Sequence, residues 1–162
     1  MNPAAVLRLR LAQAADLPRL AAYVAAFHAL EGLPAGGPSL AVLQPLLGES
    51  PHGRLWLIEL DEAPAGYLAI TFGYSIEFGG RDAFIDELFL LPEHRGRGLG
   101  RAVLEQLRRA AAALGLRALH LEVARGNERA QRLYHEAGYR PRPQFTLMSL
   151  PLDPSPAPGA AD

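Results

Sequence analysis

The sequence predicts a mixed α/β domain in which helices flank a central β-sheet. Several short segments have the alternating or continuous apolar patterns of strands, and others repeat apolar residues every three or four positions, as helices do. Turns rich in glycine and proline separate these segments. In chain order they read β-α-α-β-β-β-α-β-α-β, and this order is typical of a mixed sheet covered by helices.

The N-terminal third is expected to hold one strand and two helices. Residues Val6 to Leu11 alternate apolar and charged side chains, which predicts a strand with one wet face. Asp16 can cap a helix that opens at Leu17-Pro18, because proline is tolerated in the first turn. The segment 32–38, rich in glycine and proline, ends that helix. A second, short helix is expected over residues 39–47, with Ser39 as its cap.

Three strands are expected next, the first two of them as a hairpin. Residues 54–60 and 65–74 have strand patterns on either side of the turn at 61–64. Gly79-Gly80 marks a further turn, and the strand 83–91 follows it. These segments supply the centre of the predicted sheet.

The C-terminal half alternates helices and strands. A glycine- and arginine-rich loop over residues 92–100 runs into a helix that ends at Gly115, a natural C-terminal stop. We expect a strand at 118–123, a helix at about 128–137 and a last strand at 144–150.

Composition limits the class of protein. The 162 residues are 49% hydrophobic and 20% charged, which predicts one domain over residues 1–150 and a disordered, proline-rich tail at 151–162. The net charge of -1 does not favour nucleic acid or an anionic membrane as a partner. The chain has no cysteine and its histidines lack metal-ligand spacing, so we expect no metal. Without an apolar stretch of about 20 residues or a signal-peptide core, it is expected to be soluble and cytoplasmic.

The most specific motif is the loop between the strand 83–91 and the helix that follows. Glycines at alternate positions let the backbone take positive φ angles and let a ligand approach the main chain. The first amides of a helix lack internal partners, and its dipole is positive there. Together these features predict a phosphate site. The glycines are Gly96, Gly98 and Gly100, and Arg95, Arg97 and Arg101 add positive charge.

Two common phosphate motifs do not fit this loop. A P-loop requires lysine followed by serine or threonine, and neither is present. The dinucleotide pattern G-x-G-x-x-G fails because Arg101 stands at its third glycine. The motif that does fit is R-x-x-G-x-G, formed by Arg95, Gly98 and Gly100. It resembles the pyrophosphate-binding signature of the GNAT superfamily of N-acetyltransferases.

A second segment carries the same resemblance. The strand Leu119 to Val123 is followed by Asn127, Ala130, Leu133-Tyr134 and Gly138-Tyr139, which is similar to the strand, asparagine and helix segment of GNAT proteins. The two segments together cover about residues 83–140. The strand 85–89 is also similar to that of the diamine acetyltransferases of the superfamily.

The resemblance implies a fold and a set of cofactor contacts. The expected fold is a mixed, mostly antiparallel sheet that splays into a V-shaped gap, where acetyl-coenzyme A binds. Main-chain groups of Leu88, Phe89 and Leu90 would hold the pantetheine arm like an added strand. Asn127 would contact the same arm or serve only as a helix cap. The implied cofactor residues beyond these are Arg95, Gly96, Arg97, Gly98, Leu99, Gly100, Arg101 and Ala130.

The resemblance also implies an acid and a base. Tyr134 stands where many family members carry the acid that protonates the departing thiolate, and a phenol of pKa about 10 stays protonated at neutral pH; the alternative is a core tyrosine. Asp86 or Glu87 would deprotonate the amine, directly or through water, or both would only attract a cationic substrate. Strict alternation places Asp86 with Phe84, Leu88 and Leu90 on one face, and Glu87 with Ile85 and Phe89 on the other.

The function implied is direct transfer of an acetyl group to a primary amine in a ternary complex. The carboxylates favour a small cationic acceptor such as a polyamine or an amino-acid amine, while a protein amine is an alternative. His28, Glu31 and Glu77 are candidate acceptor-pocket residues. A coenzyme A-binding sensor without activity is a second hypothesis. Homodimerisation is a further expectation from the family.

Overall fold

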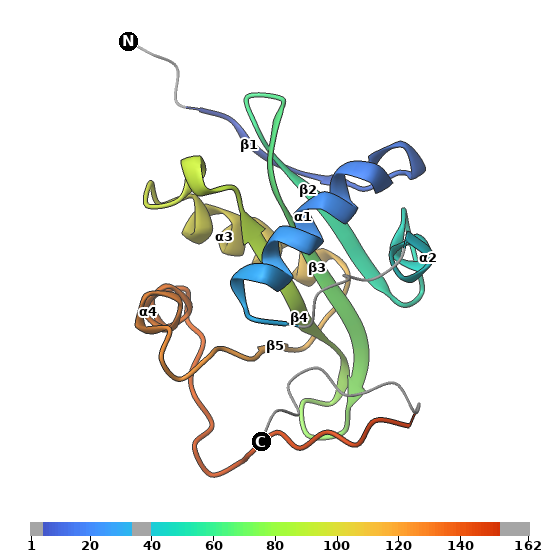
Figure 1. The fold of residues 1–162 in the computed structure, drawn as a ribbon. Coiled ribbons are helices and arrows are strands. Elements are labelled where there is room, and N and C mark those ends of the chain that lie inside the picture. The colour runs from blue at the N-terminus through green and yellow to red at the C-terminus, as the bar shows by residue number, and fades with distance from the viewer. Residues whose placement is uncertain (1–4, 34–39, 153–162) are drawn as a thin grey trace.

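The computed structural model describes residues 5–33 and 40–152 of the chain. The described residues form a five-stranded sheet in the spatial order β1-β2-β3-β4-β5, with helices on both sides (Figure 1). The strands are β1 (Leu7–Leu11), β2 (Gly53–Leu60), β3 (Ala63–Ser75), β4 (Gly80–Leu90) and β5 (Leu119–Leu121). The helices are α1 (Leu17–Leu30), α2 (Leu40–Leu43), α3 (Leu99–Ala113) and α4 (Glu128–Glu136), with short 3-10 turns at Ala14–Asp16, Gln44–Leu46 and Pro92–His94.

The sheet is antiparallel except at one edge. β1, β2, β3 and β4 pair antiparallel in succession, whereas β5 pairs parallel to β4. The parallel pairing is short, because it runs only from Ala83 opposite Leu119 to Ile85 opposite Leu121. The rest of β4, from Asp86 to Leu90, therefore has a neighbour on its β3 side but not on its β5 side. This confirms the predicted mixed, mostly antiparallel sheet with a gap between its two last strands.

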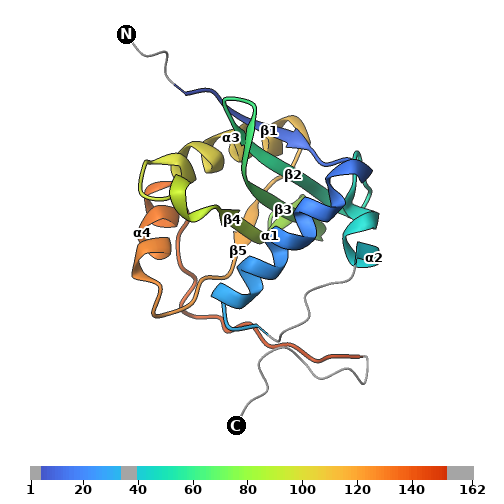
Figure 2. The same cartoon turned by 45° about the horizontal axis from the view of Figure 1, so that its top comes forward.

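Two apolar cores lie on opposite faces of the sheet, with α1 on one side and α3 on the other (Figure 2). On α1, Leu20 and Val24 are fully buried against the sheet. The repeat in α3 is confirmed at Val103 and Leu107, which pack beneath the sheet together with Leu104. Burying such side chains contributes about 1.5–3 kcal/mol each, so these two helices fix the layers.

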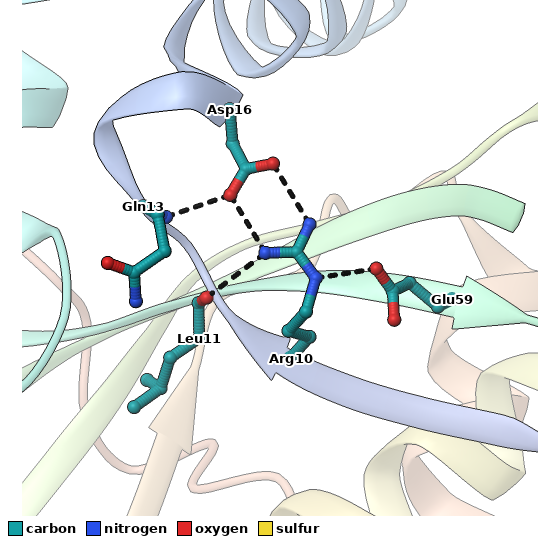
Figure 3. Close-up of polar contacts among 5 residues, drawn as sticks. All are labelled: Arg10, Leu11, Gln13, Asp16 and Glu59. Carbon is teal, nitrogen blue, oxygen red and sulfur yellow. Dashed lines mark hydrogen bonds and ion pairs between the residues drawn. The ribbon is translucent and has the colours of Figure 1, made fainter. Parts of the chain in front are cut away.

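A network of charged side chains ties β1 to the start of α1 and to β2 (Figure 3). The guanidinium of Arg10 donates to both carboxylate oxygens of Asp16 at 2.9 Å and to Glu59 Oε1 at 2.6 Å. Asp16 also accepts from the backbone N–H of Gln13 at 2.8 Å. These bonds lower the pKa of the Asp16 carboxyl, chiefly because Arg10 stabilises its ionised form. The contribution of these bonds to the stability of the folded state is therefore present at neutral pH. It is lost as the pH falls through the lowered pKa of Asp16.

The last predicted strand, 144–150, is wrong. The described chain places no ladder partner beside this segment, and every residue from 141 to 150 is exposed. A strand needs a neighbour for its backbone groups, and alternating residues alone do not provide one. Just before the segment, Arg142 donates to Glu77 Oε1 in the β3–β4 turn at 2.6 Å and stacks over the Phe145 ring. The predicted cap Ser39 and the tail at 153–162 lie outside the described residues.

Candidate active site

A β-bulge at Asp86 organises the centre of β4. Ala69 of β3 lies opposite Glu87, but the next residue, Ile70, lies opposite Ile85, so Asp86 is an extra residue in β4. A bulge shifts the alternation of side chains by one position, and bulges are frequent next to active sites. As a result Ile85 packs in the α3 core with Leu88, three residues later. The prediction that Ile85 shares a face with Glu87 was therefore wrong, because strict alternation does not continue through a bulge.

The backbone of β4 beyond the bulge has a free edge. The N–H of Leu91 donates to Ala65 O at 2.9 Å, which fixes the phase of the β3–β4 ladder. In an antiparallel pair the hydrogen-bonded residues alternate, so Glu87 and Phe89 bond to β3 while Leu88 and Leu90 direct their backbone groups to the other edge. The carbonyl of Leu90 accepts from Arg95 Nε at 2.8 Å. Leu88 is thus the residue best placed to pair with an extended ligand in the gap.

The loop after β4 has the geometry of an anion site. Gly96 and Gly98 have φ angles of 77° and 76°, and Gly98 is the residue immediately before the first turn of α3. Residues that carry a side chain rarely adopt this left-handed backbone conformation, so the two glycines determine the path of the loop. Within residues 5–33 and 40–152, no group accepts a hydrogen bond from the amides of residues 96–101. These N–H groups therefore lack a partner in the described chain, and they lie at the positive end of the α3 dipole.

The arginines of the loop are not equivalent. Arg95 folds back, bonding to Leu90 O and lying 5.4 Å from the centre of the Phe89 ring. It therefore braces the turn from β4 into the loop and does not extend toward the amides. Arg97 and Arg101 are exposed beside them. Gly100 lies close to α4, since a Cβ atom there would stand 3.0 Å from Leu133 Cδ2.

The start of α4 lies beside this loop and lines a surface hollow. Asn127 is the N-cap of α4, and its Oδ1 accepts from the N–H of Ala130 at 3.0 Å. This contact shows the capping role of Asn127; the Nδ2 group remains for another partner. Gly96 approaches α4 here, because a Cβ atom at that position would lie 3.5 Å from Arg129 Nη2. The hollow, of about 410 Å³, is lined by Gly126, Asn127, Glu128, Arg129 and Arg132.

Tyr134 of α4 packs against the α3 core with its ring half-buried. The Tyr139 ring meets it edge-on, with 5.8 Å between the ring centres. Burial raises the pKa of the Tyr134 phenol, and the charge of Glu31 at the end of α1 raises it further. The phenol is therefore protonated at neutral pH. No residue of the described chain forms a hydrogen bond with its hydroxyl, so that group is available as a donor.

The two carboxylates predicted as bases have different environments. Asp86 stands at the bulge, where its side chain reaches solvent although protein surrounds much of it. Burial raises the pKa of the Asp86 carboxyl, and the charge of Glu87 adds to that rise, while His28 opposes it. Glu87 instead points toward α1, where Oε1 lies 2.5 Å from His28 Nε2 and Oε2 accepts from Tyr67 Oη at 2.6 Å. Both Glu87 oxygens are thus occupied.

The predicted acceptor residues separate into two groups. His28 lies beside Glu87, and the charge of Glu31 raises the pKa of Tyr134; an acceptor-pocket role for the end of α1 stays a prediction. Glu77 is at the β3–β4 turn and is paired with Arg142, away from this cluster. The sequence analysis missed Tyr67, which is fully buried in β3 and directs its hydroxyl to Glu87. Its only signal in the sequence is a polar aromatic residue within an apolar strand.

Of the described residues, no group of three histidine or acidic side chains could hold a metal ion. Within the same ranges, no helix is long and apolar enough to cross a bilayer.

The fold and the site together define an α/β protein with an open sheet edge and a glycine-rich loop beside it that leads into α3. Residues 24–139 match the model of the acetyltransferase (GNAT) family, so the chain belongs to this family.

Individual relatives agree with this. The chain is 34% identical over 93 residues to the uncharacterized N-acetyltransferase YycN of Bacillus subtilis, a match covering 57% of this chain and 58% of that protein. It is 30% identical over 99 residues to a thialysine N-epsilon-acetyltransferase of Bos taurus, covering 56% and 58%. The chain thus spans less than two thirds of these curated relatives. The crystal structure of an integron cassette protein from the mobile metagenome of Cole Harbour Salt Marsh superposes with a TM-score of 0.75 at 31% identity, covering 90% of this chain and 91% of that one.

Proposed function

We propose that this protein is an N-acetyltransferase that moves the acetyl group of acetyl-coenzyme A to a primary amine of a small molecule. The observation that carries the proposal is the run of amides at residues 96–101, which have no hydrogen-bond partner among residues 5–33 and 40–152 and follow the free edge of β4. The amides suit a diphosphate, and the strand edge suits an extended arm that contains amide groups. Coenzyme A contains both a diphosphate and such an arm. Family membership supports the same assignment.

The residues present fit this cosubstrate. Its diphosphate would lie on the amides of Gly96 to Arg101, with Arg97 and Arg101 as exposed counter-charges. Its pantetheine arm would pair with the backbone of Leu88, and the hollow at the start of α4 would take part of the remaining length. When bound, acetyl-coenzyme A supplies the acetyl group as a thioester. The N–H of Leu88 would then donate to the thioester carbonyl oxygen and stabilise negative charge there.

Tyr134 and Asp86 would act on opposite sides of the reaction. Tyr134 is a half-buried, protonated phenol whose hydroxyl has no partner in the described chain, so it can give its proton to a departing thiolate. Asp86 is a solvent-exposed carboxylate at the bulge of β4, so it can hold the acceptor as an ammonium before reaction. Because Glu87 uses both of its oxygens within the protein, it is less suited to take the proton from the acceptor itself.

The acceptor is proposed to be a small cationic amine. Asp86, Glu87 and Glu31 place negative charge at one end of the gap, which attracts a polyamine or an amino-acid amine. The relative from cattle is named for a thialysine acceptor, a small amine, which supports this class. The other candidates are a protein amine and a coenzyme A-binding module without turnover.

A thiol-release assay tests the function. Acetyl-coenzyme A is offered with polyamines, amino acids including thialysine, aminoglycosides and peptides, and the free thiol is measured over time. We expect release that depends on the amine and is fastest with small diamines or basic amino acids. Thermal stabilisation by acetyl-coenzyme A without thiol release from any amine would contradict the enzyme and support the sensor. Release with peptides alone would exclude the small-molecule acceptor.

Homodimerisation and a cytoplasmic location stay predictions. The mass of the protein in solution tests the first of them.

A further inference from the structure

A line of three side chains connects β3, β4 and α1 at the end of the gap. The hydroxyl of Tyr67 donates to Glu87 Oε2 at 2.6 Å, and His28 Nε2 lies 2.5 Å from Glu87 Oε1. Tyr67 is fully buried, and the side chains of His28 and Glu87 are 19% and 17% exposed. The order is thus a buried anchor, a carboxylate and an imidazole near the surface.

The hydrogen bonds determine which nitrogen of His28 carries its proton. An ionised carboxylate only accepts hydrogen bonds, so Nε2 must hold the hydrogen that faces Glu87. In the neutral ring the lone pair is then on Nδ1. No residue of the described ranges bonds to Nδ1, and this atom is not buried. Nδ1 is therefore a basic atom that is open to solvent.

The surroundings place this imidazole near the second carboxylate of the site. The charge of His28, at the end of α1, lowers the pKa of the Asp86 carboxyl at the bulge of β4, against the larger effect of burial. Phe27 packs beside His28, with 6.0 Å between the ring centres, and also meets the Tyr67 ring edge-on at 6.4 Å. Aromatic packing therefore restricts the imidazole, as a positioned group requires.

We infer that His28 is the general base that deprotonates the acceptor amine, held in its reactive tautomer by Glu87, with Tyr67 as the anchor of that carboxylate. This inference rests on the proposed function, because it assigns a role within the same reaction. Asp86 then binds the ammonium and is not required to accept its proton.

The proton transfer balances within these residues. An N–H bond of the ammonium breaks, the amine keeps the electron pair, and the proton bonds to Nδ1 of His28. The resulting imidazolium is paired with the carboxylate of Glu87 at Oε1. The proton leaves to solvent from the partly exposed ring before the next turnover. An imidazole, with an ordinary pKa near 6.5, suits this task better than an aspartate with one near 4.

The test is chemical rescue of His28→Ala. We expect kcat with the best amine to fall about 100-fold, with the affinity for acetyl-coenzyme A unchanged. Added imidazole is expected to enter the space left by the ring and restore a substantial part of the rate. His52→Ala is the matched control, because His52 is exposed and far along the chain in the turn before β2; it should keep wild-type turnover and show no response to imidazole.

Tyr67 is tested as a positioning residue by Tyr67→Phe, which keeps the packed ring and removes only the hydroxyl. We expect about a tenfold fall in kcat in the wild-type background and no further fall in the His28→Ala background, since the hydroxyl acts through the imidazole. A residue needed only for packing would lower turnover in both backgrounds alike.

The outcomes distinguish a failure of the role assigned to His28 from a failure of the proposed acetyltransferase function. If the wild-type protein turns over and His28→Ala is equally active, or is inactive while folded and not rescued by imidazole, the assignment of His28 is overturned and the proposed function stands. If the wild-type protein releases no thiol with any amine, both are overturned. A rescued His28→Ala together with non-additive Tyr67→Phe supports the whole line of residues.

Discussion

Phenylalanine in place of Tyr134 is expected to lower kcat about 100-fold while leaving the affinity for acetyl-coenzyme A unchanged. The substitution removes only the hydroxyl, and that hydroxyl has no partner in the described chain whose loss would disturb the fold. The thiolate must then leave without a positioned acid. Single-turnover thiol release and calorimetric titration of acetyl-coenzyme A measure the two quantities separately.

The pH dependence gives a second measure of the same role. Because burial raises the pKa of the Tyr134 phenol above its ordinary value near 10, the acid stays protonated to higher pH. Any loss of wild-type activity caused by ionisation of Tyr134 is therefore expected only above about pH 10.

Tyr139→Phe is the matched control for Tyr134→Phe. The Tyr139 ring packs against the Tyr134 ring, and burial raises the pKa of its phenol to about 12, so the two tyrosines share an environment. Turnover of Tyr139→Phe should stay within about twofold of the wild type, whereas Tyr134→Phe should lose about 100-fold because it lacks the general acid. Equal turnover in Tyr134→Phe and the wild type would remove Tyr134 from the mechanism.

Alanine in place of Gly66 is expected to lower the free energy of unfolding by about 3 kcal/mol and to impair the binding of acetyl-coenzyme A. A Cβ atom at Gly66 would stand 2.0 Å from the carbonyl oxygen of Phe89 and 3.0 Å from Leu90 Cα. Both are backbone atoms of β4, so the clash can be relieved only by moving the strand that forms the site. Urea unfolding gives the first quantity and calorimetric titration the second.

Gly73→Ala is the matched control, since Gly73 lies on the same strand and also faces β4. There the added Cβ atom would meet the side-chain oxygen of Asp82 at 2.5 Å, which can move without the backbone. We expect a loss of about 1 kcal/mol or less and unchanged coenzyme binding. If the two variants were equally stable, the close approach of β3 and β4 at Gly66 would not be a constraint.

The sequence was sufficient where local patterns determine structure. The repeat of apolar residues over 99–114 predicted α3 because its buried face depends on spacing alone. The glycines at 96 and 98 predicted the loop because left-handed backbone angles strongly favour this residue. The path of this loop could therefore be predicted before any tertiary contact was known, while its role as an anion site stays a prediction.

The features that escaped prediction depend on pairing between distant segments. The bulge at Asp86 comes from the register of β3 against β4, and no local pattern marks it. The hydrogen bonds among His28, Tyr67 and Glu87 join residues that lie 20 and 59 positions apart. Conversely, residues 144–150 have a strand pattern without a neighbouring strand in the described chain. An alternating pattern of apolar and polar residues shows that a segment can form a strand, but it does not show which strand the segment pairs with.

In amide NMR spectra recorded during a titration with acetyl-coenzyme A, the Gly96, Gly98 and Gly100 resonances are expected to be among those that move most, and the amides of residues 96–101 are expected to exchange more slowly when saturated. Saturable binding that leaves these resonances in place, or no binding at all, would contradict the proposed diphosphate site at these amides.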